Sequence, residues 1–335
     1  MLKNDSSKYL PTLDQVIDHY PLTVAPDTPL AEVITLMGQR RPSCSLNADI
    51  PPTDIYQQLT EIANPPTSSA CRDAAGICVF VVEKSLEKFS SHSAKNSQLH
   101  GIFTDRDLVD LIASGKNLKG VTIAEVMRQP AATLIKSETQ DLFSAIILLR
   151  QGRIHHLPIL DSEGQLLGVI TPESIRQAML QPANILKMRS VKEVMTAQVI
   201  QAPRSASVIS LAELMAQHRV SCVVITESTE LSMNLSFPIP VGIVTERDIV
   251  EFQALDIDLS QTIAETVMST PLFSLKQEDS LWVAHQEMQQ RLVRRLVVTG
   301  EQGELLGIVT QSNLLRVLDP MEMSAVIDVL HHSVA

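Results

Sequence analysis

Two short segments of the chain combine residue types that could bind a phosphorylated sugar. Each reads glycine, two apolar residues, threonine, two further residues and aspartate, in Gly101 to Asp107 and in Gly242 to Asp248. A threonine where a strand gives way to a helix lies beside free backbone N–H groups and the positive end of the helix dipole, a favourable place for phosphate. An aspartate on the first helical turn can accept two hydrogen bonds from the vicinal hydroxyls of ribose. The candidate phosphate and ribose residues are Thr104, Asp107, Thr245 and Asp248.

The same threonine–aspartate spacing is also the capping box of an ordinary helix, which stabilises by about 1 kcal/mol. A cap and a ligand role do not exclude each other. Two further copies lack the aspartate, because Thr171 is followed by Ser174 and Thr310 by Asn313. Serine offers a diol only a single weak contact and asparagine adds no charge, so we expect the better ribose sites in the first and third copies.

Phosphate needs a positive counter-charge, and the arginine pair Arg294 and Arg295 in the fourth copy could supply it. The second copy has His155 and His156 at the corresponding place, which would hold phosphate only when protonated. We therefore expect a weaker or pH-sensitive site in the first half of the chain. The histidine pair equally fits a strand with one ring buried and one exposed. Two further arginines, within T-D-R-D and T-E-R-D, are either phosphate ligands or partners of neighbouring acidic side chains: Arg106 and Arg247.

These segments belong to a unit that recurs four times. Its closing element is always glycine, two apolar residues and threonine, and its opening element is a short apolar and acidic or amide run that ends in methionine in three copies. From opening residue to closing threonine the separations are 91, 48, 54 and 47 residues, so the first copy carries insertions, which we place as loops at about 42–75 and 84–98. The third copy carries a smaller insertion at 228–238. The openings are Leu13 to Ile17, Ile123 to Met127, Val191 to Met195 and Ile263 to Met268.

The third copy gives the clearest order of elements. Val199 and Ile200 suggest a short strand, and residues 207–217 have the apolar spacing of an amphipathic helix. Two β-branched runs at 220–226 and 241–245 predict strands, and a second helix is expected from Glu246. Strand, helix, strand, strand and helix, repeated, predict an α/β protein of small sheets covered by helices.

This arrangement resembles the CBS domain, the repeat of about 60 residues named after cystathionine beta-synthase, over about residues 10–319. The resemblance implies four CBS-type βαββα repeats, paired into two pseudo-twofold modules with ligand clefts between the paired sheets. It also implies the assignment of Thr104 and Thr245 to phosphate or ribose and of Asp107 and Asp248 to ribose, and it matches His156 to an arginine of the family. The expected repeats span 10–118, 119–182, 187–257 and 259–319.

The resemblance further implies a regulatory, non-catalytic module that senses AMP, ADP or ATP, with S-adenosylmethionine or a cyclic dinucleotide ranked behind, and that contains no cofactor. Its state would pass to an output domain such as a histidine kinase or a cyclase, in cis or in trans, and a homodimer is expected. The alternative is a structural or dimerisation module without a physiological nucleotide. The tail, 320–335, is expected to be a short helix on the modules or the start of a linker helix.

Composition and motifs exclude other classes. With 27 basic and 38 acidic residues the net charge is -11, which disfavours nucleic acid as a partner. No apolar run is long enough to cross a bilayer and the first ten residues lack a signal-peptide pattern, so we expect no membrane insertion and a cytoplasmic location. Four cysteines without C-x-x-C spacing predict neither disulfide nor metal. Common nucleotide-binding, metalloprotease and hydrolase motifs do not occur, and the repeats leave little chain for a catalytic domain.

Overall fold

The computed structural model describes residues 12–39, 77–84, 97–130, 132–136, 142–152, 154–178, 183–231, 235–315 and 317. The predicted insertion at 42–75 and the tail at 320–335 lie outside these residues. So does most of the insertion at 84–98, except that strand β2 continues to Lys84 and strand β3 begins at Ser97.

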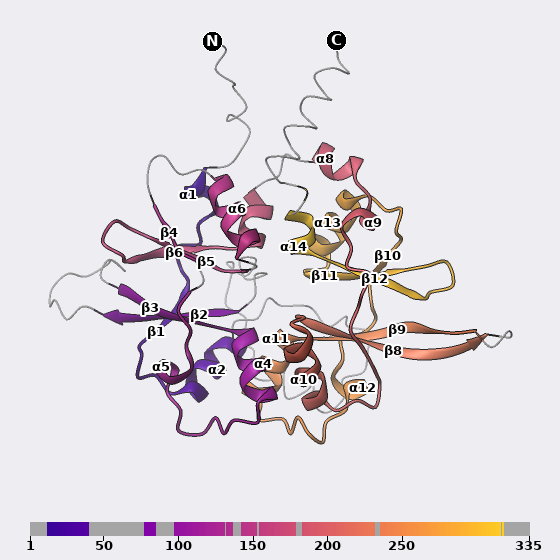
Figure 1. Ribbon diagram of the computed structural model, residues 1–335, viewed down its shortest axis with the longest axis horizontal. Helices are drawn as coiled ribbons and strands as arrows, with labels where there is room; N and C mark the ends of the chain where they lie inside the picture. The colour runs from indigo at the N-terminus through magenta and orange to yellow at the C-terminus, as the bar shows by residue number, and fades with distance from the viewer. Residues whose placement is uncertain are drawn as a thin grey trace, which may run out of the picture.

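The described residues form four three-stranded sheets of one topology (Figure 1). In each sheet the first strand runs parallel to the second, which pairs antiparallel with the third. The sheets are β1 (Leu22–Val24), β2 (Cys78–Lys84) and β3 (Ser97–Thr104); β4 (Leu134–Ile135), β5 (Leu157–Leu160) and β6 (Leu166–Ile170); β7 (Gln201–Pro203), β8 (Cys222–Leu231) and β9 (Leu235–Thr245); β10 (Ser274–Leu275), β11 (Arg295–Thr299) and β12 (Leu305–Thr310). The predicted α/β repeat is therefore confirmed in all four copies.

One helix follows the first strand of each sheet and a second follows the third strand. These pairs are α2 (Leu30–Gln39) and α4 (Asp105–Ala113), α6 (Leu142–Gln151) and α7 (Pro172–Ala178), α10 (Val208–His218) and α11 (Glu246–Ala254), and α13 (Leu281–Gln290) and α14 (Gln311–Leu315). The opening elements are one-turn helices, α1 (Leu13–Val16), α5 (Ile123–Val126), α9 (Val191–Val194) and α12 (Ala264–Val267), and α8 (Ala183–Met188) connects the second and third repeats. None of the helices among the described residues combines the length and apolarity needed to span a bilayer.

The third repeat confirms its two predicted helices and corrects two details. Helix α10 follows the N-cap Ser207, whose hydroxyl accepts from the backbone N–H of Ser210. However, Val199 and Ile200 precede the strand, which begins at Gln201. Both ends of the insertion at 228–238 are strand, because β8 runs to Leu231 and β9 starts at Leu235. Both strands lengthen together, so their backbone groups find partners in the ladder, and the hairpin extends away from the body (Figure 1).

The sheets pack face to face in two pairs, which confirms the two predicted modules. The apolar side chains between the first and second sheets include Phe80, Ile102 and Val169. Those between the third and fourth include Val224 and Ile308. We call repeats one and two the N-terminal module and repeats three and four the C-terminal module.

Each opening helix packs on the other repeat of its module. Leu13 and Val16 of α1 lie in the core of the second repeat, and Ile123 of α5 lies in the core of the first. The residue after each opening forms a backbone bridge to the third strand of the partner repeat, in the pairs Asp18–Val169, Arg128–Ile102, Thr196–Ile308 and Ser269–Ile243. The two repeats of a module are therefore interlocked rather than merely stacked.

The two modules share one hydrophobic core. Helices α2 and α4 of the first repeat pack on α10 and α11 of the third, and their buried side chains form a single cluster. The approach is close, because a Cβ added to Gly38 of α2 would lie 2.8 Å from Cβ of Ala254 in α11. Repeats two and four meet through α7 and α14, so the four repeats surround a common centre (Figure 1).

Candidate functional site

The predicted threonine–aspartate pairs both form capping boxes. Oδ2 of Asp107 accepts hydrogen bonds from the backbone N–H (2.8 Å) and the hydroxyl (2.7 Å) of Thr104. Oδ2 of Asp248 accepts the equivalent bonds from Thr245 at 2.7 and 2.9 Å. Burial raises the pKa of both carboxyls, although the bonds from threonine oppose that rise. The capping interpretation is correct at both positions, and it leaves a ligand role open.

The other two copies show that the cap does not need a carboxylate. Oδ1 of Asn313 accepts from the backbone N–H and hydroxyl of Thr310 at 2.8 and 2.7 Å, which is the same geometry. In the second copy the hydroxyl of Ser174 accepts from the N–H of Thr171 at 3.0 Å. Helix capping therefore does not require the negative charge of Asp107 or Asp248.

A cavity of about 690 Å³ lies at the junction of the four repeats, and residues of all four line it. We call it the central cavity. The predicted site residues on its wall are Thr104, Arg106, Asp107, His155, His156, Arg294, Arg295, Thr310 and Asn313. The predicted residues Thr171, Thr245, Arg247 and Asp248 are not among its lining residues.

The cavity has two sides of equivalent construction. On the first, Thr104 and Asp107 of the first repeat face the segment from Arg128 to Pro130 and the histidine pair of the second repeat. On the second, Thr310 and Asn313 of the fourth repeat face the segment around Thr196 and residues 221–222 of the third repeat. The only predicted aspartate on this cavity is therefore that of the first side.

Two contacts at the centre join the modules through the first turns of their helices. Nε of Arg106 in α4 donates to Oε1 of Glu246 in α11 at 2.9 Å. The side-chain amide of Gln311 in α14 donates to Oε2 of Glu173 in α7 at 2.5 Å. Arg106 thus pairs with an acidic residue, as one of the two predictions had it, but that residue belongs to the other module.

Sequence reasoning missed the buried acidic residues of this centre. The side chains of Asp105, Glu173 and Glu246 are among the few buried charged groups in the part of the chain that the structure describes. Burial, together with the charge of Asp105, raises the pKa of Glu246 to about 7, although Arg106 opposes this rise. The sequence signal was the acidic residue directly after the threonine in the first and third copies.

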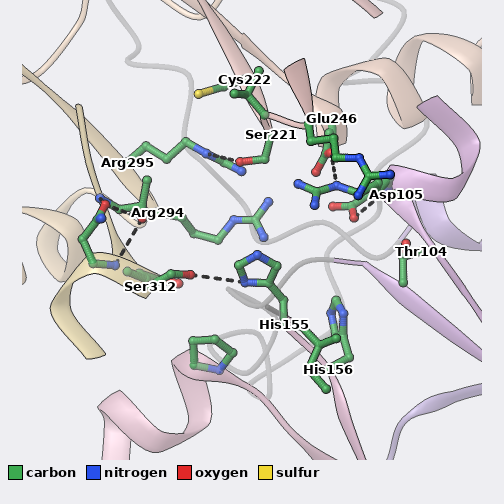
Figure 2. A pocket seen from close by; sticks show the side chains of 18 of the residues that line it. Thr104, Asp105, His155, His156, Ser221, Cys222, Glu246, Arg294, Arg295 and Ser312 are labelled. Atoms are coloured by element: carbon green, nitrogen blue, oxygen red, sulfur yellow. Dashed lines mark hydrogen bonds and ion pairs between the residues drawn. The ribbon is translucent and has the colours of Figure 1, made fainter. Parts of the chain in front are cut away.

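Arg294 is the cation best placed to meet a ligand. Its side chain reaches into the space between His155 and Glu246 (Figure 2), and among the described residues its guanidinium has no hydrogen bond or ion pair. Burial and the neighbouring Arg295 lower the pKa of Arg294 to about 10, so it is charged at neutral pH. Arg295 instead donates from Nε to Oγ of Ser221 at 3.3 Å.

The histidine pair divides into one exposed and one buried ring. His156 is buried, whereas His155 is exposed on the cavity wall with Nδ1 3.2 Å from Oγ of Ser312 (Figure 2). Although its surface is open to the cavity, the surrounding protein desolvates His155, and this desolvation together with the charges of His156 and Arg106 lowers the pKa of His155 to about 4. At neutral pH His155 is therefore uncharged and supplies hydrogen bonds rather than a counter-charge.

Two cysteines take the place that Arg295 has in the fourth repeat. Cys78 pairs with Thr104 and Cys222 with Thr245, as Arg295 pairs with Thr310. Burial raises the pKa of both thiols, so neither is charged at neutral pH. No group of three or more metal-binding side chains is found among the described residues, and Cys44 and Cys71 lie outside them.

Comparison with known proteins identifies the family. The CBS domain family matches residues 123–181, 191–255 and 263–320, which together are more than half of the chain. The chain belongs to the CBS domain family. The first repeat lies outside the matched segments, but its sheet has the same strand order and pairing as the other three.

Individual relatives share parts of the chain. An uncharacterized protein of Methanopyrus kandleri is 30% identical over 129 residues, which are 38% of this chain and 62% of that protein. The γ-3 subunit of the 5′-AMP-activated protein kinase of Bos taurus is 25% identical over 54% of this chain and 38% of its own length. The chain thus spans less than two thirds of either relative.

A solved structure shows the same fold over nearly the whole chain. Protein MJ1225 of Methanocaldococcus jannaschii, described as a candidate archaeal homologue of γ-AMPK, superposes with a TM-score of 0.65. The match covers 92% of this chain and 100% of that one at 18% identity. At this identity the likeness establishes the fold alone.

Proposed function

We propose that the chain is a regulatory module that binds an adenine nucleotide in the central cavity and passes its occupancy to an output domain, in cis or in trans. The ribose lies on Asp107 and the phosphate faces Arg294. The module is non-catalytic, carries no cofactor, acts in the cytoplasm and forms a homodimer. AMP, ADP or ATP is the expected ligand, ahead of S-adenosylmethionine or a cyclic dinucleotide.

The observation that carries this proposal is the position of Arg294, a charged side chain without a partner among the described residues, inside a cavity shared by four repeats. The volume of the cavity, about 690 Å³, lies within the range of small-molecule sites. A ligand there touches both modules, so its affinity depends on how they are arranged, which is the condition for a sensor. The kinase subunit among the relatives, named for activation by 5′-AMP, supports an adenine nucleotide.

Four further predicted residues lie outside the lining of the central cavity, at positions that correspond in their own repeats to residues on its wall. By position in their repeats, Thr245 and Asp248 form a second ribose site, with Arg247 as its candidate phosphate ligand, and Thr171 marks a weaker site. Thr310 and Asn313 mark the uncharged counterpart of the first site on the central cavity. One strong site per module remains our expectation.

The alternative, a structural or dimerisation module, is supported by the capping role of both threonine–aspartate pairs, which gives these residues a structural purpose of their own. The exposed Ile147 on α6, at 41% exposure, fits a helix-mediated contact in either case.

A thermal-shift series with AMP, ADP, ATP, S-adenosylmethionine and a cyclic dinucleotide tests the two functions. A ligand at about 100 times its Kd adds about 2.7 kcal/mol of stability, which moves the midpoint by several degrees because about 1 kcal/mol is worth roughly 2–4 °C in domains of about 150–250 residues. A flat response to every compound would leave only the structural function.

The variant Asp107→Asn separates ribose binding from helix capping. Asn313 shows that asparagine keeps the capping geometry, so the free protein should lose little stability. Measured in the Asp248→Asn background, which removes the second aspartate site, the nucleotide-dependent shift should fall sharply, because the carboxylate that accepts the diol is gone. Loss of stability without ligand and an unchanged nucleotide shift would assign Asp107 to capping alone.

A further inference from the structure

Both oxygens of Asp107 are engaged. Oδ2 accepts the two capping bonds from Thr104. Oδ1 is ion-paired with Nε of Arg128, 2.6 Å away, and the same guanidinium donates to Oδ2 of Asp110 at 2.8 Å. A ribose diol that donates two hydrogen bonds to Asp107 must therefore displace Arg128 from Oδ1.

The third repeat has the same carboxylate without the arginine. Arg128 forms two backbone hydrogen bonds with Ile102, at 2.8 and 2.9 Å, and Ser269 forms the same pair with Ile243 at 3.2 and 2.9 Å. Position 269 is thus the counterpart of position 128. Oδ2 of Asp248 accepts its capping bonds from Thr245, but among the described residues no hydrogen bond or ion pair reaches its Oδ1.

Arg128 is free to move toward a ligand. Its side chain is 59% exposed, whereas that of Asp107 is 9% exposed, and both line the central cavity. A phosphate offers the guanidinium two oxygens in the geometry that arginine prefers, so it can replace the carboxylate as a partner. A nucleoside without phosphate offers nothing in exchange for the ion pair it must break.

We infer that Arg128 makes the first ribose site selective for phosphorylated nucleosides. Phosphate draws Arg128 away and so frees Oδ1 of Asp107 for the ribose, whereas the Asp248 site, with Ser269, lacks this requirement. Arg128 is in this sense a specificity-determining residue. The inference rests on the proposed function, since it concerns the ligand of the same site.

The test measures AMP and adenosine affinities by titration calorimetry in the Asp248→Asn background, which silences the other aspartate site while keeping its cap. In this background Arg128→Ser should weaken AMP binding about tenfold, the worth of a charge-assisted hydrogen bond. It should strengthen adenosine binding about threefold, the worth of an exposed ion pair. The ratio of the two affinities should therefore fall by more than tenfold.

Two matched variants guard against a purely structural effect. Arg219→Ser removes another arginine of the same cavity, for which the structure gives no contact with Asp107, and should leave the ratio of affinities unchanged. Ser269→Arg in the Asp107→Asn background transplants the arginine and should raise the preference of the Asp248 site for AMP over adenosine.

An Arg128→Ser variant with both affinities unchanged, or lowered equally, would overturn the selectivity while leaving nucleotide binding in place. Absence of binding of either compound to every variant, including the parent, would overturn the proposed function and the selectivity with it.

Discussion

At the scale of single residues, two groups on the central cavity make stability depend on pH in opposite directions. The pKa of Glu246 is about 7 in the folded state against an ordinary 4.5, so between these values the folded state binds more protons than the unfolded chain. Its contribution therefore falls as pH rises. The pKa of His155 is about 4 against 6.5, so the unfolded chain binds more protons and the contribution of His155 rises with pH.

The variant Glu246→Gln should leave the contribution of His155 as the larger part of the pH dependence of stability in this range. Without the carboxyl, stability should rise more steeply with pH between about 4.5 and 6.5 than in the parent protein, and the full Glu246 effect amounts to about 3 kcal/mol at most. His155→Gln should tilt the profile the other way. Urea unfolding midpoints across this range measure both, with the exposed Glu278→Gln as a control that keeps the parent profile. Parallel profiles for the parent and Glu246→Gln would contradict the assignment.

The sequence predicted the chemistry of single copies better than the contacts between them. The threonine–aspartate spacing identified both capping boxes, and one of them lies on the cavity. Arg128 was missed because it follows the opening run and reaches the partner repeat only through the interlocked fold. Aligning the residue after each opening would have shown an arginine in one copy alone.

The pairing of Arg106 with Glu246 could not be predicted from the sequence, for a different reason. Spacing along the chain gives the position of each residue in its helix, but not which helices meet at their first turns. That depends on the packing of one module against the other.

At the scale of elements, the invariant closing glycine and the opening methionine turn out to be one contact. A Cβ on Gly101 would lie 2.6 Å from Sδ of Met127, and one on Gly307 would lie 2.9 Å from Sδ of Met195. Gly242 likewise lies close to the side chain of Met268. The opening without methionine ends in Ile17, which packs on Gly168 together with the carbonyl of Asp18. The sequence showed the closing glycine and the opening methionine only as recurring features of the repeat. Their contact could not be predicted from it, because each opening helix packs on the partner repeat.

Gly168→Ala should cost more stability than Gly242→Ala. The new methyl group at 168 meets the backbone carbonyl of Asp18, which cannot rotate away, so a loss of about 1–3 kcal/mol is expected. At 242 the nearest atom is the flexible end of Met268, and the double variant with Met268→Ala should show a favourable coupling of about 1 kcal/mol. Urea unfolding of the set measures both. Equal losses at the two glycines, with no coupling at 242, would contradict this explanation of the motif.

At the scale of the whole molecule, the shared core makes the two modules one cooperative unit. Buried side chains of the first and third repeats belong to a single cluster, with Val33 and Leu108 on one side and Leu211 and Ile249 on the other. Separating the modules would expose this cluster to water at about 25 cal/mol per Å² of apolar surface. The same arrangement carries the Arg106–Glu246 contact, so a ligand at the centre acts on both modules at once.

Ile249→Ala tests this cooperativity across the module boundary. Ile249 is fully buried in α11 of the third repeat, so its truncation should destabilise by about 2–5 kcal/mol. The core around Ile249 also contains residues of the N-terminal module. Hydrogen exchange of the backbone amides in α4 and β3 of that module should therefore accelerate by the factor that corresponds to the same loss of free energy. Leu281→Ala, equally buried in the separate core of the fourth repeat, is the matched variant and should leave the exchange of the α4 and β3 amides unchanged. If α4 kept its protection in Ile249→Ala while α11 lost it, the modules would open independently, and ligand binding at the centre would have no shared core through which to couple them.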